Sequence, residues 1–179
     1  MNEPHAVNAS EWYSGAVPAI KAIRAAGATQ MIFIPGTFYS GAHAWNSSHN
    51  AAVWAGFKGD PLNNFAFEMH QYLDADSSGT HKACHVNASH SLIGATEWLI
   101  ANKFKGFLGE FGWSDDPTCD NESLAFIGYL SANPDAWLGW TWWCGGPWYP
   151  WNYMFRLDPL DFIQPYIEKP QMATLVAHI

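Results

Sequence analysis

Four short apolar runs recur along the chain at regular intervals. They are Met31–Pro35, Phe65–Leu73, Gly106–Phe111 and Trp137–Trp143, and their first residues lie 34, 41 and 31 positions apart. Runs of this length, without strict alternation of apolar and polar residues, are typical of buried parallel strands. The spacing matches consecutive strand–helix units with right-handed crossovers. The pattern therefore predicts an α/β fold with a parallel sheet.

Helical patterns fill the gaps between these runs. A helix is expected from Ser10, as its N-cap, to about Ala26, with Pro18 either kinking it or delaying its start. Further helical patterns cover Ser89–Asn102 and Asn121–Ala132, with a weaker one at Ser47–Ala55 and a remnant of a last helix around Phe162–Ile163 and Tyr166–Ile167.

Composition narrows the class of protein. The 179 residues are 49 % hydrophobic and only 13 % charged, which excludes a disordered chain and fits one domain with a real core. The net charge of −8 leaves no basic stripe for nucleic acid, and no apolar run is long enough to span a bilayer. Eleven Trp residues fit either an aromatic core or a surface that stacks on sugar rings.

The three cysteines, Cys84, Cys119 and Cys144, form no C-x-x-C motif. Neither a zinc site nor a redox pair is indicated, and one disulfide with one free thiol would suit a secreted protein. The opening MNEPHAVN has no features of a signal peptide. The histidines at 43, 49, 81, 85 and 90 are irregularly spaced, so we expect surface histidines and no metal site.

Polar side chains gather where the predicted strands end. Glu3, His70, Glu110 and Trp143 each lie at or near the C-terminal end of an apolar run, where strand–helix barrels build their active sites. Two facing carboxylates, here Glu3 and Glu110, can cleave a glycosidic bond, and a separation of about 5–5.5 Å retains the anomeric configuration. Each glutamate alone could be an ordinary surface carboxylate.

Aromatic and histidine side chains accompany the two glutamates. His70 and Tyr72 lie two residues apart and share one side of a strand, so both can point into one pocket. A Tyr hydroxyl there can donate to a carboxylate and hold it ionised. Trp143 and Trp142 face opposite ways along their strand, so one can floor a sugar site while the other packs outward.

Five segments of the chain, in their order along it, resemble motifs of glycoside hydrolase family 5, most closely those of its secreted endo-β-1,4-glucanases. The segments are MNEPH, IPGTFY, FEMHQYLDADSSGTH, GEFG and LGWTWWCGGPW. The resemblance implies retaining hydrolysis on a (β/α)8 barrel, with no cofactor. It implies that Glu3 is the acid/base, that Asn2 contacts the sugar 2-hydroxyl and that Glu110 is the nucleophile. His70 and Tyr72 match the pair on the sixth strand, and Trp143 matches the platform of the −1 subsite.

The resemblance covers residues 1 to about 160, and the first three strands of the family's barrel have no counterpart. A barrel needs about 250 residues. We therefore expect a single partial barrel over residues 1–179, from the end of strand 4 to strand 8, as an open sheet flanked by helices. Cys84 and Cys119 both follow strands on the active face, so a disulfide between them is possible.

Three functions remain open for such a half-barrel. The first is hydrolysis of β-1,4-glucan, weakened or lost, with mannan or xyloglucan as the alternative substrate. The second is glucan binding without turnover, through Trp143, Trp148, Tyr149 and Trp151. The third is self-assembly alone. Exposed sheet edges favour a homodimer or higher oligomer in each case.

Overall fold

The computed structural model describes residues 1–159 and 167–179. Its four strands form one parallel sheet in the order β1-β2-β3-β4, which is also their order along the chain. The strands are β1 (Ile32–Pro35), β2 (Phe65–Tyr72), β3 (Gly106–Gly112) and β4 (Trp137–Trp142). The predicted parallel α/β sheet is confirmed, and Trp143 lies just beyond the last strand.

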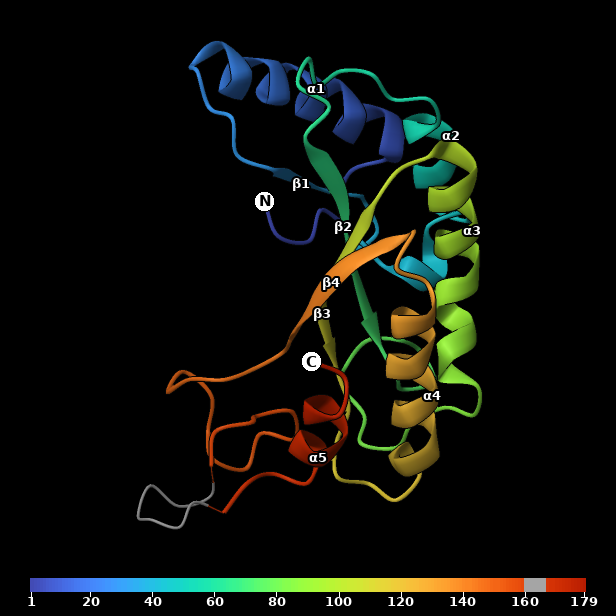
Figure 1. The fold of residues 1–179 in the computed structure, drawn as a ribbon, viewed down its shortest axis with the longest axis vertical. Helices are drawn as coiled ribbons and strands as arrows, with labels where there is room; N and C mark the ends of the chain where they lie inside the picture. Colours follow the sequence, from blue (N-terminus) through green and yellow to red (C-terminus); the bar gives the residue numbers. More distant parts are fainter. Residues whose placement is uncertain (160–166) are drawn as a thin grey trace.

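Helices cover one face of this sheet and leave the other face open (Figure 1). The helices are α1 (Ala9–Ala25), α2 (Asn50–Trp54), α3 (Ile93–Asn102) and α4 (Cys119–Ala132), whereas α5 (Gln171–Val176) lies beyond the C-terminal ends of the strands (Figure 1). Short 3-10 turns occur at Ala42–Ala44 and Ala88–Leu92. None of these helices is long and apolar enough to cross a membrane.

Several helix boundaries differ from those expected. Asn8, not Ser10, caps α1: its side chain accepts a hydrogen bond from the Glu11 amide, and the helix begins at Ala9. Pro18 lies inside α1 and does not delay its start. The Ser89–Asn102 segment opens as a 3-10 turn before α3 begins at Ile93. The apolar pair Phe162–Ile163 lies outside the described residues.

Aromatic side chains fill the core between the sheet and its helices. Phe67 of β2 is fully buried and lies within 6 Å, ring centre to ring centre, of Trp45, Trp54 and Trp98. Edge-to-face and tilted ring pairs of this kind add to the stabilisation from apolar burial. Five of the eleven Trp residues are buried, so the core accounts for much of the Trp content.

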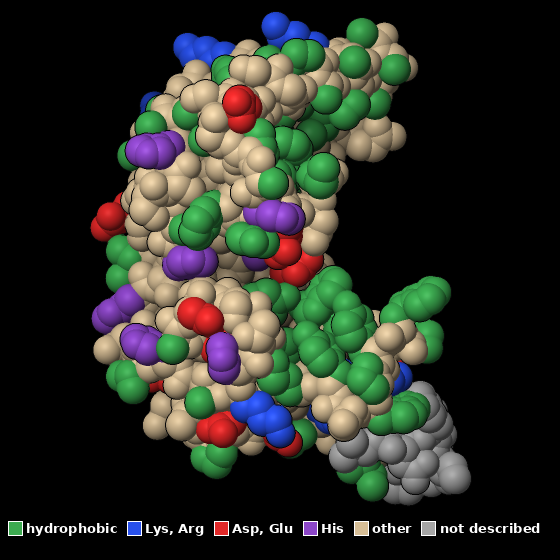
Figure 2. Space-filling model, turned by 180° about the vertical axis from the view of Figure 1, so that it is seen from behind, with side chains coloured by type: hydrophobic (Ala, Val, Ile, Leu, Met, Phe, Trp, Pro, Cys, Tyr) green, Lys and Arg blue, Asp and Glu red, His purple; other side chains and the backbone are tan. Residues whose placement is uncertain are grey.

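The opposite face of the sheet is the hollow side of a crescent (Figure 2). Acidic and histidine side chains lie near the middle of the hollow, between hydrophobic ones. Phe33 of β1 and Leu138 of β4 are 45 % and 46 % exposed, although they lie on strands. The edges of the sheet therefore carry apolar surface that nothing in the described part of the chain covers.

Candidate active site

The C-terminal ends of three adjacent strands and the N-terminal segment converge on one site. His70 and Tyr72 end β2, Glu110 lies in β3 directly beside His70 in the strand register, and Trp143 follows β4. A register shift between Met69 and His70 interrupts the pairing of β2 with β3 at this point.

The two glutamates face one another across the imidazole of His70. An oxygen of Glu3 and an oxygen of Glu110 lie within 4.8 Å of each other and of the ring. His70 Nδ1 is 2.7 Å from Glu3 Oε1 and 3.4 Å from Glu110 Oε2. This is the short separation at which one carboxylate can attack a sugar carbon while the other handles the proton.

His70 is buried among carboxylates. Burial opposes a charge on its ring, but the hydrogen bond and charge of Glu68, the charge of Glu110 and the hydrogen bond to Glu3 together raise the pKa of His70 to about 9. The imidazolium is therefore the dominant form at neutral pH. Its positive charge lies between two carboxylates that would otherwise repel each other.

Tyr72 donates a hydrogen bond to Glu110, with Oη 3.0 Å from Oε2. Burial raises the pKa of Glu110, whereas the charge of His70, the Tyr72 hydroxyl and the Asn2 side chain oppose that rise. Burial and the Glu110 charge also raise the pKa of Tyr72, so its hydroxyl remains a donor. The sequence expectation that Tyr72 reaches a carboxylate is confirmed in geometry.

Backbone contacts hold the segment that carries Glu3. The Tyr39 amide donates to the Pro4 carbonyl at 3.1 Å, and the rings of His5 and Tyr39 stack with their centres 4.7 Å apart. The Thr37 hydroxyl donates to the Val7 carbonyl. Phe38, Tyr39 and Ser40 all adopt positive φ near 57°, which costs free energy for residues other than glycine. This left-handed turn presents the amide that holds Pro4.

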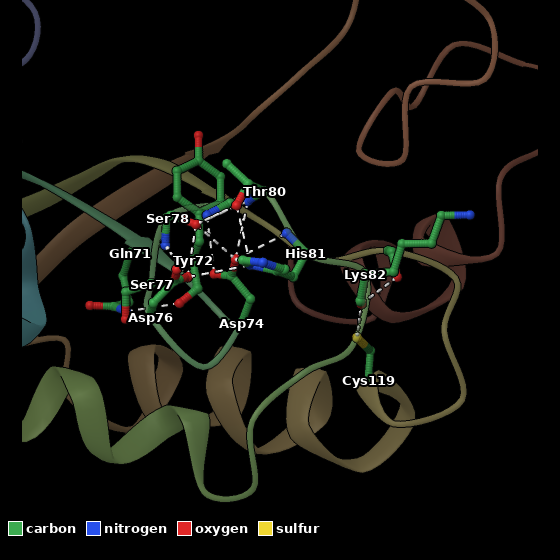
Figure 3. A network of polar contacts seen from close by, with 12 residues as sticks. Gln71, Tyr72, Asp74, Asp76, Ser77, Ser78, Thr80, His81, Lys82 and Cys119 are labelled. Carbon is green, nitrogen blue, oxygen red and sulfur yellow. Dashed lines mark hydrogen bonds and ion pairs between the residues drawn. The ribbon is translucent and has the colours of Figure 1, made fainter.

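A loop after β2 forms one wall of the site, and Asp74 holds the loop together (Figure 3). The buried Asp74 carboxylate accepts hydrogen bonds from the amides of Gly79, Thr80 and His81 at 3.0–3.1 Å. Gly79 has φ +70°, and a Cβ there would lie 2.8 Å from the Tyr72 ring. The loop therefore packs its backbone directly on Tyr72.

The Asp74, Asp76 and His81 side chains come close enough to share a cation. The Asp74 oxygens are already taken by backbone amides, which explains the cluster as a brace for the loop. That the protein binds no metal remains an expectation from the sequence.

A cavity of about 660 Å³ opens above the two glutamates. Its lining joins the N-terminal segment, the loop after β2 and the aromatic segment after β4 and includes Asn2, Glu3, Tyr72, Glu110, Trp143 and Tyr153. Six of the seven predicted site residues therefore meet here, since His70 lies directly beneath Glu3 and Glu110.

Trp148 is the exception among those seven. It is 91 % exposed and lines a separate hollow with Tyr149, Trp151 and Arg156.

Trp142 points the other way from Trp143, as expected: its Nε1 donates to the Phe155 carbonyl, and its ring packs on Trp113.

Sequence reasoning missed Glu68. Its carboxylate lies 2.8 Å from His70 Nε2. The available signal was the alternation of β2, in which Glu68, His70 and Tyr72 lie on one side of the strand. Two arginines pair with carboxylates other than Glu3 and Glu110: Arg24 pairs with Asp60 at 2.7 Å, and Arg156 pairs with Asp158 at 2.9 Å.

The disulfide that the sequence made possible is present in the structure. Cys84 and Cys119 form a disulfide that joins the segment after β2 to the start of α4. Cys144 is free and buried.

Comparison with known proteins decides the family. The family model described as cellulase (glycosyl hydrolase family 5) matches residues 1–146. The chain belongs to glycosyl hydrolase family 5. It is 38 % identical over 180 residues to endo-beta-1,4-glucanase A of Emericella nidulans, covering 92 % of this chain and 53 % of that relative.

Solved structures of endoglucanases support the same family assignment. The endo-beta-1,4-glucanase Xac0029 of Xanthomonas axonopodis pv. citri superposes with a TM-score of 0.92 at 41 % identity. XacCel5A in complex with cellopentaose gives a TM-score of 0.93 at 43 % identity. These matches cover 99 % and 100 % of this chain but 57 % and 58 % of those structures.

The chain thus spans 36–53 % of the length of the curated family 5 relatives it matches. Together with the open four-stranded sheet, this makes the structure a partial TIM barrel, as expected from the sequence.

Proposed function

We propose that the site hydrolyses β-1,4-glucosidic bonds with retention of configuration. The observation that carries the proposal is the placement of Glu3 and Glu110, with oxygens within 4.8 Å of each other on the floor of one cavity. Membership of family 5 supports the reaction class. The names of the relatives and the cellopentaose complex of a neighbour support a glucan as the substrate.

Glu110 is the nucleophile in this proposal, because Tyr72 and His70 both stabilise its ionised form. One of its oxygens forms a bond to the anomeric carbon as the bond from that carbon to the leaving oxygen breaks. Glu3 gives its proton to that leaving oxygen. Glu3 then takes a proton from water, the resulting hydroxide attacks the anomeric carbon, and Glu110 leaves as a carboxylate.

Asn2 and Trp143 bind the sugar in this proposal. Asn2 lines the cavity beside Glu110 and can reach the 2-hydroxyl. Trp143 offers a ring as the platform for the reacting sugar. Mannan or xyloglucan is the alternative substrate, because the loops that wall the cavity set the choice among such polymers.

We expect turnover well below that of a complete barrel. Four strands enclose one side of the site, and Glu3 depends on a few backbone and ring contacts for its position. A displacement of 1 Å at a reacting group can cost about 100-fold in rate.

Glucan binding without turnover is the second candidate function. Trp148 and Trp151 are 91 % and 50 % exposed beside the cavity, and flat exposed rings can stack on sugar. Self-assembly alone is the third. Exposed Phe33 and Leu138 on the edge strands support a homodimer or higher oligomer, with or without activity.

Secretion is part of the proposal and rests on the disulfide between Cys84 and Cys119, because such bonds persist in oxidising compartments.

The test is hydrolysis of a soluble β-1,4-glucan by the chain, by Glu110→Gln and by a control, Glu97→Gln, on the exposed side of α3. We expect turnover by the chain and the control and none by Glu110→Gln. Binding of cellopentaose by all three without turnover would select the second candidate. Neither binding nor turnover would leave assembly, and a monomer in sedimentation at micromolar concentration would exclude that.

A further inference from the structure

Glu68 is a third carboxylate beneath the two proposed catalytic glutamates. It lies in β2, two residues before His70 and on the same side of the strand. Its side chain is 15 % exposed, and it crosses in front of β3 at Gly109. A Cβ at Gly109 would lie 2.0 Å from Glu68 Oε1, so glycine at this position leaves the space that the carboxylate occupies.

The two nitrogens of His70 both face carboxylates. Nε2 lies 2.8 Å from Glu68 Oε1, and Nδ1 lies 2.7 Å from Glu3 Oε1. A neutral imidazole carries a proton on one nitrogen only, so only the imidazolium can donate in both directions. The ring itself is almost fully buried, with 4 % exposed, and cannot turn to water for a partner.

We propose that Glu68 is a positioning residue for the hydrolytic reaction, which holds His70 doubly protonated and aims its Nδ1–H at Glu3 and Glu110. It acts through His70 and touches no substrate. Its importance for catalysis rests on the proposed function, whereas its effect on His70 does not.

The groups around His70 agree with this role. Glu3 and Glu110 approach it from the side of the cavity, and the Tyr72 hydroxyl donates to Glu110. His43 and His70 line the adjoining hollow together. Among the groups that raise the pKa of His70 against the effect of burial, Glu68 has the strongest influence. Removal of its charge should therefore release the proton from His70 nearer to neutral pH.

The test is titration of the His70 ring nitrogens by NMR in the full chain. The His70 signals are assigned by their loss in His70→Asn. Glu68→Gln keeps the size of the side chain and removes its charge, and Glu97→Gln is the matched control on the surface. We expect the His70 midpoint to fall by about one pH unit or more in Glu68→Gln and to stay unchanged in Glu97→Gln.

An unchanged midpoint in a folded Glu68→Gln protein would overturn the proposal. If that variant does not fold, the unmodified chain decides: both ring nitrogens of His70 should be protonated at pH 7.5, and a neutral ring would overturn the proposal. Gly109→Ala offers a second route, because its methyl group should displace Glu68 and lower the same midpoint.

This readout requires no glucan. A chain without turnover whose His70 responds to Glu68→Gln would contradict the proposed hydrolysis and leave the role of Glu68 on His70 intact. In an active chain, the loss of activity on the alkaline side should begin at a lower pH in Glu68→Gln than in the unmodified chain, because His70 loses its charge at a lower pH there. The same limb should stay unchanged in Glu97→Gln.

Discussion

Tyr72→Phe removes one oxygen atom from the site and tests the proposed role of Glu110. Tyr72 Oη donates to Glu110 Oε2 at 3.0 Å, and this bond favours the ionised carboxylate. A hydrogen bond to a charged group contributes about 1.5–3 kcal/mol, and one pKa unit corresponds to about 1.4 kcal/mol. The pKa of Glu110 should therefore rise by about 1–2 units.

A nucleophile must be ionised, so a raised pKa of Glu110 moves the acid limb of kcat/KM to higher pH by the same amount. Two assays follow this shift: the pH profile of cellopentaose hydrolysis and a carbon-13 titration of the Glu110 carboxyl, which needs no turnover. Tyr129→Phe on α4 is the control. If Tyr72→Phe folds normally and neither the titration nor the acid limb moves, the assignment of Tyr72 to Glu110 is wrong.

Three further predictions concern the structure around the site. Replacing Cys84 and Cys119 by Ser opens a loop of 35 residues, which should cost about 4 kcal/mol and lower Tm by about 8–16 °C; an equal Tm with and without reductant would contradict this. The hydrogen bond from Arg24 lowers the pKa of Asp60 to about 2, so its stabilisation is present above about pH 4 and is lost as the pH falls to about 2. Asp60→Asn should remove that part of the acid unfolding, as followed by circular dichroism, and an unchanged acid transition would count against it. Gly79→Ala should force the loop off the Tyr72 ring and lower kcat about 10-fold or more, while an unaltered kcat would show that the loop adjusts freely.

The sequence predicted the sheet well because its signal is local. The strands begin at Ile32, Phe65, Gly106 and Trp137, each within one residue of the start of its apolar run. Helix starts were less certain, because several residues near a boundary can cap. Asn8 and Ser10 are both good N-caps, and only the packed structure shows that Asn8 accepts from the Glu11 amide.

The candidate site was predictable where residues lie at strand ends. Glu3, His70, Tyr72 and Glu110 converge because parallel strands present their C-terminal ends at one edge. Trp148 could not be placed, because it lies in an irregular segment whose path no periodicity describes.

Two supporting features gave no clear sequence signal. Glu68 went unnoticed inside a strand that is otherwise mostly apolar, and the space for its carboxylate depends on Gly109, one strand away on β3. The left-handed turn at residues 38–40 contains no glycine, so nothing in its composition predicts positive φ.

The stereochemistry of hydrolysis tests the central claim most directly. Proton NMR of cellopentaose cleavage by the chain, recorded before the products mutarotate, shows which anomer forms first. The short separation of Glu3 and Glu110 predicts the β-anomer, with no product from Glu110→Gln. First formation of the α-anomer, or equal product from Glu110→Gln, would contradict the account.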